Sequence, residues 1–369
     1  MEKVKVKELV PIVNVCFYAN IYHWYASVHH SVDIFRNMTR ASLENGSHLH
    51  SIVCSEIFFQ RAFWCGKPLL RLKEDIQDLR SILPRKTSML QCMHQATCNL
   101  LDGNENNPAI LYGKDFDCRM FLKNEKKGFD IAIVSVIASF LAFLFHDFDT
   151  ALEMIEISKS MKKRFPPSTY LWPIFYLYEG LISLSFARRG VEIEKWSEKA
   201  KQNIMKLRDL CHDAPENFQN KYHLLEAELA AVQNNKAQAI FHYKKAICLS
   251  KKNNFVHEEA LACERAGIFY LELDSQEATA LLLQSYHGYN IWGATSKMNQ
   301  LLQNYPFLKD KVHHPTIEPY STGEELRVSH PLQDSVSLLT GDGDDESSLN
   351  LWDKQKRIRC STTRKEGTE

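Results

Sequence analysis

The chain has 369 residues, 44% of them hydrophobic, and its 45 lysines and arginines balance 45 aspartates and glutamates. Zero formal net charge argues against a general nucleic-acid binder and a polybasic membrane adsorber, because both need an excess of positive charge. Only 14 glycines and 12 prolines argue against a turn-rich all-β fold and favour long helices.

The first 125 residues are predicted to form a helical region that packs on the rest of the chain. Gly66 followed by Pro68 fits the end of one helix and the immediate start of another. From there, Leu69, Leu72 and Ile76 recur with the period of a helix, which predicts a helix up to residue 82.

Residues 131–145 read IAIVSVIASFLAFLF, a run of 15 residues without a charge. A membrane-spanning helix needs about 20 apolar residues, so this run is too short to span. A helix that is apolar all round also fits a fully buried core helix. We therefore predict a core helix here and no membrane partner.

Small residues recur at offsets of 12 and 7 residues in three places, which indicates a repeat. The triplets are Ser139, Ala151, Ser158; Ala227, Ala239, Ala246; and Ala266, Ala278, Ser285, with a fourth candidate around Gly180 and Ala200. Two antiparallel helices need small side chains where their backbones come closest. The pattern predicts an all-α fold of tetratricopeptide-like antiparallel helix pairs in a superhelical repeat over residues 126–310, with turns at 233–235 and 273–275.

Residues 311–369 differ in composition from the rest of the chain. They hold 14 hydrophobic residues against 20 serines, threonines, glycines and prolines. Such a segment buries too little apolar surface to offset the entropy of ordering it. A disordered polar tail is the prediction.

A search for catalytic, cofactor and metal motifs favours none. The sequence lacks a P-loop, GxSxG and HExxH, and its ten cysteines form no CxxC pair, which favours reduced thiols in a cytoplasmic protein. Histidines cluster at 23, 29, 30, 48 and 50, but the neighbours 29 and 30 point in different directions on a helix. His146-Asp147 is interpreted as a helix end with its cap, and Glu258-Glu259 with Glu226 and Glu228 as solvated helix faces.

The most specific resemblance lies in residues 210–308 and extends more weakly back to residue 55. It is carried by Ala214-Pro215-Glu216-Asn217-Phe218, by Glu258 to Ala262, by Trp292-Gly293-Ala294 with Lys297, and by Tyr305-Pro306. These strings look like the tetratricopeptide-like helical segment that follows the STAND/AAA-type ATPase module in large multidomain signalling proteins, such as hybrid sensor histidine kinases and serine/threonine-kinase-like ATPases. The ATPase, GAF and kinase parts of that family have no counterpart in this sequence.

The resemblance implies a non-catalytic regulatory or scaffold module of a signalling ATPase system, which binds protein segments or a neighbouring ATPase or kinase domain. The alternative is a fragment of a multidomain ATP-dependent enzyme (ATPase, histidine kinase or nucleotide cyclase) whose catalytic part is missing from this chain. In either case we expect no catalytic residue, cofactor or metal ligand in this chain.

Counting from the small anchors places certain side chains on the concave side of the repeats. For two helices these are Lys221, Leu224, Glu228 and Tyr270, which we predict to bind a partner. In the 131–145 helix the same offsets give only apolar residues, among them Phe140 and Phe143. An open groove there would be an adhesive apolar patch, so we expect helices from residues 1–125 to cover it.

Overall fold

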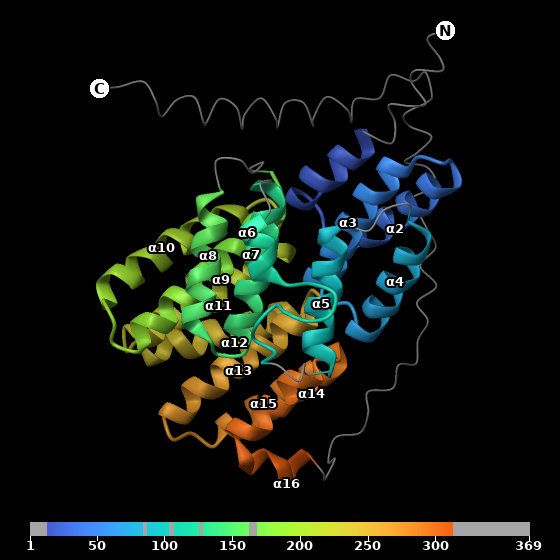
Figure 1. The fold of residues 1–369 in the computed structure, drawn as a ribbon. Helices are drawn as coiled ribbons and strands as arrows, with labels where there is room; N and C mark the ends of the chain where they lie inside the picture. Colours follow the sequence, from blue (N-terminus) through green and yellow to red (C-terminus); the bar gives the residue numbers. More distant parts are fainter. Residues whose placement is uncertain (1–12, 84–86, 103–106, 125–127, 162–167, 313–369) are drawn as a thin grey trace, which may run out of the picture. The chain divides into compact units, whose positions relative to one another are not determined.

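Four antiparallel helix pairs follow one another between residues 128 and 292 (Figure 1). The computed structural model describes residues 13–83, 87–102, 107–124, 128–161 and 168–312. The pairs are α7 (Gly128–Leu144) with α8 (Phe148–Ser160), α9 (Leu171–Arg188) with α10 (Ile193–Leu210), α11 (Pro215–Val232) with α12 (Lys236–Lys252), and α13 (Val256–Glu272) with α14 (Glu277–Trp292). Each pair also packs on the next, so the predicted all-α fold of tetratricopeptide-like helix pairs is confirmed.

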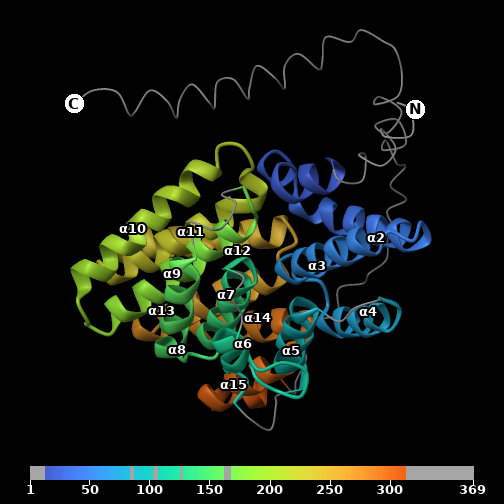
Figure 2. The ribbon, with the colours of Figure 1, turned by 45° about the horizontal axis from the view of Figure 1, so that its top comes forward.

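The helices between residues 13 and 102 pack beside the pairs, and both views show them on one side of the repeats (Figures 1 and 2). Residues 13–20 are helical. They are followed by η1 (Tyr22–Trp24), α2 (Val28–Glu44), α3 (His48–Trp64), α4 (Leu69–Ile82), α5 (Ser88–Asp102) and α6 (Cys118–Asn124). After the pairs come α15 (Thr295–Asn304), η3 (Pro306–Leu308) and α16 (Lys309–Val312). In the described part of the chain the only strand-like pairing is an isolated bridge between Tyr112 and Asp117.

The small residues of the repeat pattern lie where paired helices touch. All nine members of the three triplets are buried. The Ser139 hydroxyl donates a hydrogen bond to the Ala151 carbonyl oxygen at 2.8 Å, directly across the α7–α8 pair. Gly180 of the fourth candidate serves a different contact, because a Cβ there would lie 2.6 Å from Leu225 of α11 rather than against α10.

The turns inside and between the pairs use residues with left-handed backbone. His146, Asn234, Asn254 and Asp274 have φ between 53° and 66°, a region that asparagine and aspartate enter more readily than most residues. At the first of these turns Asp147 caps α8, and its side chain accepts a hydrogen bond from the Thr150 amide at 3.1 Å. The interpretation of His146-Asp147 as a helix end with its cap is therefore confirmed.

The apolar helix α7 lies in the centre of the core, and its side chains from Ala132 to Leu144 are buried. Phe140 contacts the rings of Phe63 and Trp64 of α3, with centroids 5.6 and 5.3 Å apart, and Trp292 of α14 approaches from another side. The expected cover from the N-terminal helices is thus present over Phe140. No helix in the described ranges has the length and apolar character needed to cross a membrane.

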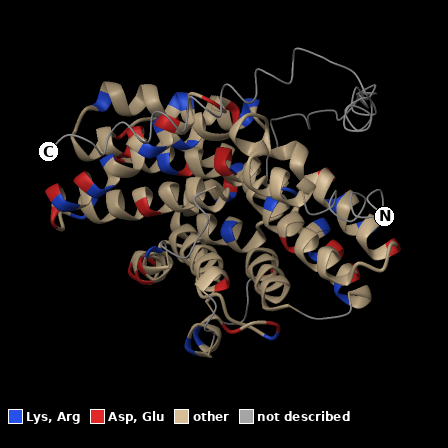
Figure 3. Ribbon diagram, turned by 90° about the horizontal axis from the view of Figure 1, so that it is seen from above, with Lys and Arg blue, Asp and Glu red and all other residues tan. Residues whose placement is uncertain are grey.

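The contacts divide the chain into one unit up to Pro315 and a second from Thr316 onward. A single apolar cluster runs from Val28 of α2 to Leu301 of α15, so the N-terminal helices and the repeats share one core. The second unit, and with it the predicted disordered tail, lies outside the described residues. Acidic and basic residues are intermixed along the described helices (Figure 3).

Candidate functional site

The four side chains predicted to face an open groove are all buried. Lys221, Leu224, Glu228 and Tyr270 are 1, 3, 0 and 5% exposed. The expectation of an accessible concave surface at these positions is therefore wrong. The physical reason is that α11 packs on α9 and is joined to α13 by ion pairs, while η1 and α2 dock against α11, where Asn217 accepts a hydrogen bond from the Val28 amide at 2.9 Å.

Lys221 is held in an enclosed ion pair between α11 and α13. Its Nζ donates to Glu258 Oε2 at 2.8 Å and to the Asn217 carbonyl oxygen at 2.9 Å, and it lies 4.1 Å from the centre of the Phe255 ring. Asn220 donates to the same Glu258 oxygen. Glu258 is thus part of the interior and not of a solvated helix face, which corrects the sequence interpretation.

Glu228 forms the second buried ion pair, with Arg265 of α13. Arg188 of α9 and the hydroxyl of Tyr243 also reach its carboxylate, at 3.3 and 2.8 Å. Burial by itself would raise the pKa of Glu228, but the two guanidinium groups outweigh it and hold this pKa at about 2. The carboxylate is therefore ionised inside the core, and the solvated-face interpretation is wrong for Glu228 as well.

A third buried pair joins α13 to α15. Lys297 Nζ donates to Glu264 Oε1 at 2.7 Å and to the Leu144 carbonyl oxygen at the end of α7. His146 and the Tyr289 hydroxyl bond the same carboxylate. Lys297 belongs to the strings that carried the family resemblance, and here it links three helices.

Within the three ion pairs the two partners are 37, 37 and 33 residues apart in the sequence. That interval is about the length of one helix pair. Two of the ion pairs join α11 to α13, the first helices of successive pairs, and the third joins α13 to α15. A search for opposite charges one repeat apart would have found them. Such buried pairs join neighbouring helices through their side chains.

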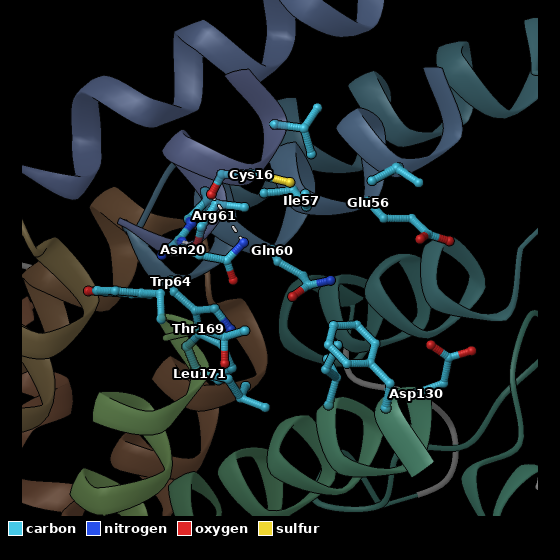
Figure 4. A pocket seen from close by; sticks show the side chains of 16 residues that line it. Cys16, Asn20, Glu56, Ile57, Gln60, Arg61, Trp64, Asp130, Thr169 and Leu171 are labelled. Carbon is cyan, nitrogen blue, oxygen red and sulfur yellow. Dashed lines mark hydrogen bonds between the residues drawn. The ribbon is translucent and has the colours of Figure 1, made fainter. Parts of the chain in front are cut away.

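A pocket of about 350 Å³ lies between the helix at 13–20, α3, α7 and the start of α9 (Figure 4). We call it the Arg61 pocket. Most of its wall is apolar, and the apolar residues lining it include Val15, Ala19, Val53, Ile57, Ile133 and Leu171. A volume near 350 Å³ is within the range of natural small-ligand sites.

Arg61 supplies the positive charge of the pocket wall. One of its Nη atoms donates to the Ala19 carbonyl oxygen at 2.8 Å and lies 3.2 Å from His23 Nδ1, and its guanidinium stacks over the Tyr170 ring at 4.6 Å. Burial lowers the pKa of Arg61 to about 10, so the group remains charged at neutral pH. In the described ranges Arg61 forms no ion pair with a carboxylate.

Three side chains of the pocket wall carry buried polar atoms without a hydrogen-bond partner. They are Arg61 Nη1, Trp64 Nε1 and the Tyr170 hydroxyl. Buried polar groups in native proteins are nearly always bonded, so three at one pocket need an explanation. Arg61 and Trp64 can only donate, and the tyrosine hydroxyl can donate as well, so the group that would satisfy them is an acceptor.

The acidic side chains of the pocket, Glu56 and Asp130, lie across it from Arg61 (Figure 4). The cationic and the acidic side chains of the pocket wall thus stand on opposite sides of it.

The histidine clusters do not assemble into a metal centre in the described ranges, which contain no group of three or more histidine, cysteine, aspartate or glutamate side chains suited to a metal. His23 is buried beside Arg61, whereas His30 is exposed.

The Arg61 pocket was not predicted from the sequence. One signal was present, since Arg61 stands between Phe58-Phe59 and Ala62-Phe63-Trp64 in a helix that is otherwise apolar around it. An arginine among apolar residues can form an ion pair inside the core or bind a ligand, and the sequence alone does not distinguish these two roles. No family model, curated protein or solved structure matches the chain.

Proposed function

We propose that the chain is a non-catalytic helical-repeat module that binds a segment of another protein at the Arg61 pocket. The observation that carries this proposal is Arg61 in the wall of an apolar pocket, a buried guanidinium that forms no ion pair with a carboxylate in the described ranges. The helix-pair fold supports it, because stacked helix pairs commonly present binding surfaces for extended segments. The buried ion pairs have a structural role that leaves this pocket as the best site for recognition.

The resemblance described above supplies the finer part of the proposal. It suggests that the partner is an ATPase or kinase domain of a signalling system, and that the module acts there as a regulator or scaffold. No specific feature of the described residues favours the alternative, a fragment of an ATP-dependent enzyme.

Two exposed cysteines offer a matched test. Cys16 lines the Arg61 pocket, whereas Cys248 lies exposed on α12 away from it. The full chain, with Cys360 and either Cys248 or Cys16 replaced by serine, is labelled at the remaining exposed cysteine with a benzophenone maleimide, and the labelled position is verified by peptide mass spectrometry. After irradiation in an extract of the native host, we expect a defined protein adduct from Cys16 that is absent from Cys248.

The adduct must then be reproduced with the purified partner, and binding must weaken when the pocket is filled by Ile57→Trp. Equal adducts from the two cysteines would contradict the proposal. So would a purified partner whose affinity is the same for the Ile57→Trp variant and the unchanged chain.

A further inference from the structure

We infer that the group bound in the Arg61 pocket is a carboxylate joined to an apolar group, with the carboxylate at Arg61 and the apolar group against α3 and α7. This inference deepens the proposed function and rests on it. It names the chemistry of the segment that enters the pocket.

The charge of the ligand follows from what Arg61 lacks. A guanidinium enclosed in the protein is normally paired with a carboxylate, because an unpaired buried charge is costly. Arg61 has a carbonyl oxygen and a neighbouring imidazole nitrogen instead. An incoming carboxylate would supply the missing charge, and its two oxygens suit the planar donor fork of arginine.

The Arg61 guanidinium favours an anion over a cation. A carboxylate has about four lone-pair sites, so it can accept from more than one N–H group of the guanidinium. A cationic ligand would meet a like charge at Arg61.

The apolar part of the ligand follows from the remaining walls. Ala19, Ile57, Ile133 and Leu171 surround the space next to Arg61, and burial of an apolar group there is favourable by about 25 cal/mol per Å². A carboxylate next to an apolar side chain occurs at the C-terminus of a peptide that ends in a residue such as leucine. It also occurs where an acidic side chain neighbours an apolar one, so the experiment must separate these two sources.

The experiment uses the full chain and three small probes, N-acetyl-leucine, N-acetyl-leucinamide and the α-amide of N-acetyl-glutamate. Affinity is measured by isothermal titration calorimetry at pH 7 and low salt. We expect at least one carboxylate probe to bind about tenfold or more tightly than the uncharged leucinamide, since a charge-assisted hydrogen bond contributes about 1.5–3 kcal/mol. Tighter binding of N-acetyl-leucine identifies a C-terminal carboxylate, and tighter binding of the glutamate probe identifies a side chain.

Variants at Arg61 test where the carboxylate binds. Arg61→Met should abolish the preference for a carboxylate, Arg61→Lys should retain part of it, and Arg36→Met should leave it unchanged, because Arg36 lies in an exposed ion pair with Asp75 on another part of the surface. If Arg61→Met does not fold, Ile57→Trp provides the second test, and it should exclude both carboxylate probes.

The inference is overturned if the leucinamide binds as tightly as the carboxylates, or if the preference survives in folded Arg61→Met. These failures are distinguishable from failure of the proposed function. Suppose that a partner still crosslinks specifically to Cys16 while no carboxylate probe binds more tightly than the leucinamide. The proposed protein-binding function is then supported, and only the inference about a carboxylate is wrong.

Discussion

Glu228 of α11 and Arg265 of α13 face each other through two parallel hydrogen bonds, Nε to Oε1 at 2.8 Å and an Nη atom to Oε2 at 2.7 Å. Both side chains are buried, with 0% of Glu228 and 7% of Arg265 exposed to solvent. This bidentate geometry fixes both the distance and the rotation of one helix relative to the other.

Replacing Glu228 should be among the most destabilising polar substitutions in the protein. Glu228→Gln keeps the shape but leaves Arg265 buried without a counter-charge, and breaking such a pair costs about 3–5 kcal/mol. The free energy of unfolding in urea measures the loss. Glu228→Gln combined with Arg265→Met should be less harmful than the sum of the single changes, and strict additivity would show that the two groups do not interact.

Stability should fall in mild acid, in part because of His257. Burial, and then the nearby Lys221 and His29, lower the pKa of His257 to about 3, while the unfolded chain has a value near 6.5. Below pH 6.5 the imidazole of His257 binds a proton in the unfolded state but not in the folded state. Its contribution to the free energy of unfolding is therefore fully present above pH 6.5 and is lost as the pH falls toward 3.

The contribution of this residue is a slope of about 1.4 kcal/mol per pH unit between these values. His257→Gln should reduce the slope of unfolding free energy against pH between 6 and 4 by that amount. His30→Gln, a change at an exposed histidine, is the control that should leave the slope as it is. An unchanged slope in His257→Gln would mean that His257 is protonated in the folded protein.

Gly180→Ala should destabilise the protein although alanine favours helix. Alanine gains about 1 kcal/mol in helix propensity over glycine, but the new Cβ would lie 2.6 Å from Leu225 Cδ1. Overpacking of a core costs about 1–3 kcal/mol, so we expect a net loss. Thermal unfolding of Gly180→Ala, Leu225→Ala and the double variant measures it, and a double variant that is no worse than Leu225→Ala alone would confirm the clash as the cause.

Cysteine reactivity should separate into two classes in the native protein. Cys16 and Cys248 are exposed, whereas Cys65 and Cys118 are buried and burial raises the pKa of each thiol to about 12. Peptide mass spectrometry after brief iodoacetamide treatment at pH 8 should find the first two modified and the last two untouched until urea is added. Rapid native labelling of Cys65 would contradict the packing of α3 in the core.

The sequence predicted the helices well because their signals are local. The apolar period after Pro68 located α4 correctly from Leu69 to Ile82, and the turns at 233–235 and 273–275 lie where the small-residue triplets placed them. Small residues at fixed offsets report the closest approach of two backbones, and that distance depends little on the remainder of the fold. Ser139 and Ala151 show it directly.

The environment of Lys221 and Glu228 was not predictable in the same way. The repeat geometry located them correctly on the first helices, but a helical position alone does not state what covers it. Beside Lys221 the cover comes from η1 and α2, nearly 200 residues earlier in the chain, through Asn217 and its bonds to Val28 and Ala26. Glu228 is enclosed by side chains of α9, α12 and α13. The Arg61 pocket likewise depends on contacts between α3 and α9 that no local pattern encodes.

The ion pairs that recur one repeat apart have a consequence for how the protein can be shortened. Arrays of stacked repeats often tolerate the loss of a terminal unit, because each unit contacts only its neighbours. Here, deletion of α15 would remove Lys297, and the enclosed carboxylate of Glu264 would lose its lysine partner. Loss of α13 would likewise remove the carboxylate partner of Lys221, and it would leave Glu228 with Arg188 as its remaining cation. Shortening this array from its end should therefore cost more stability than in arrays whose repeats share only apolar contacts.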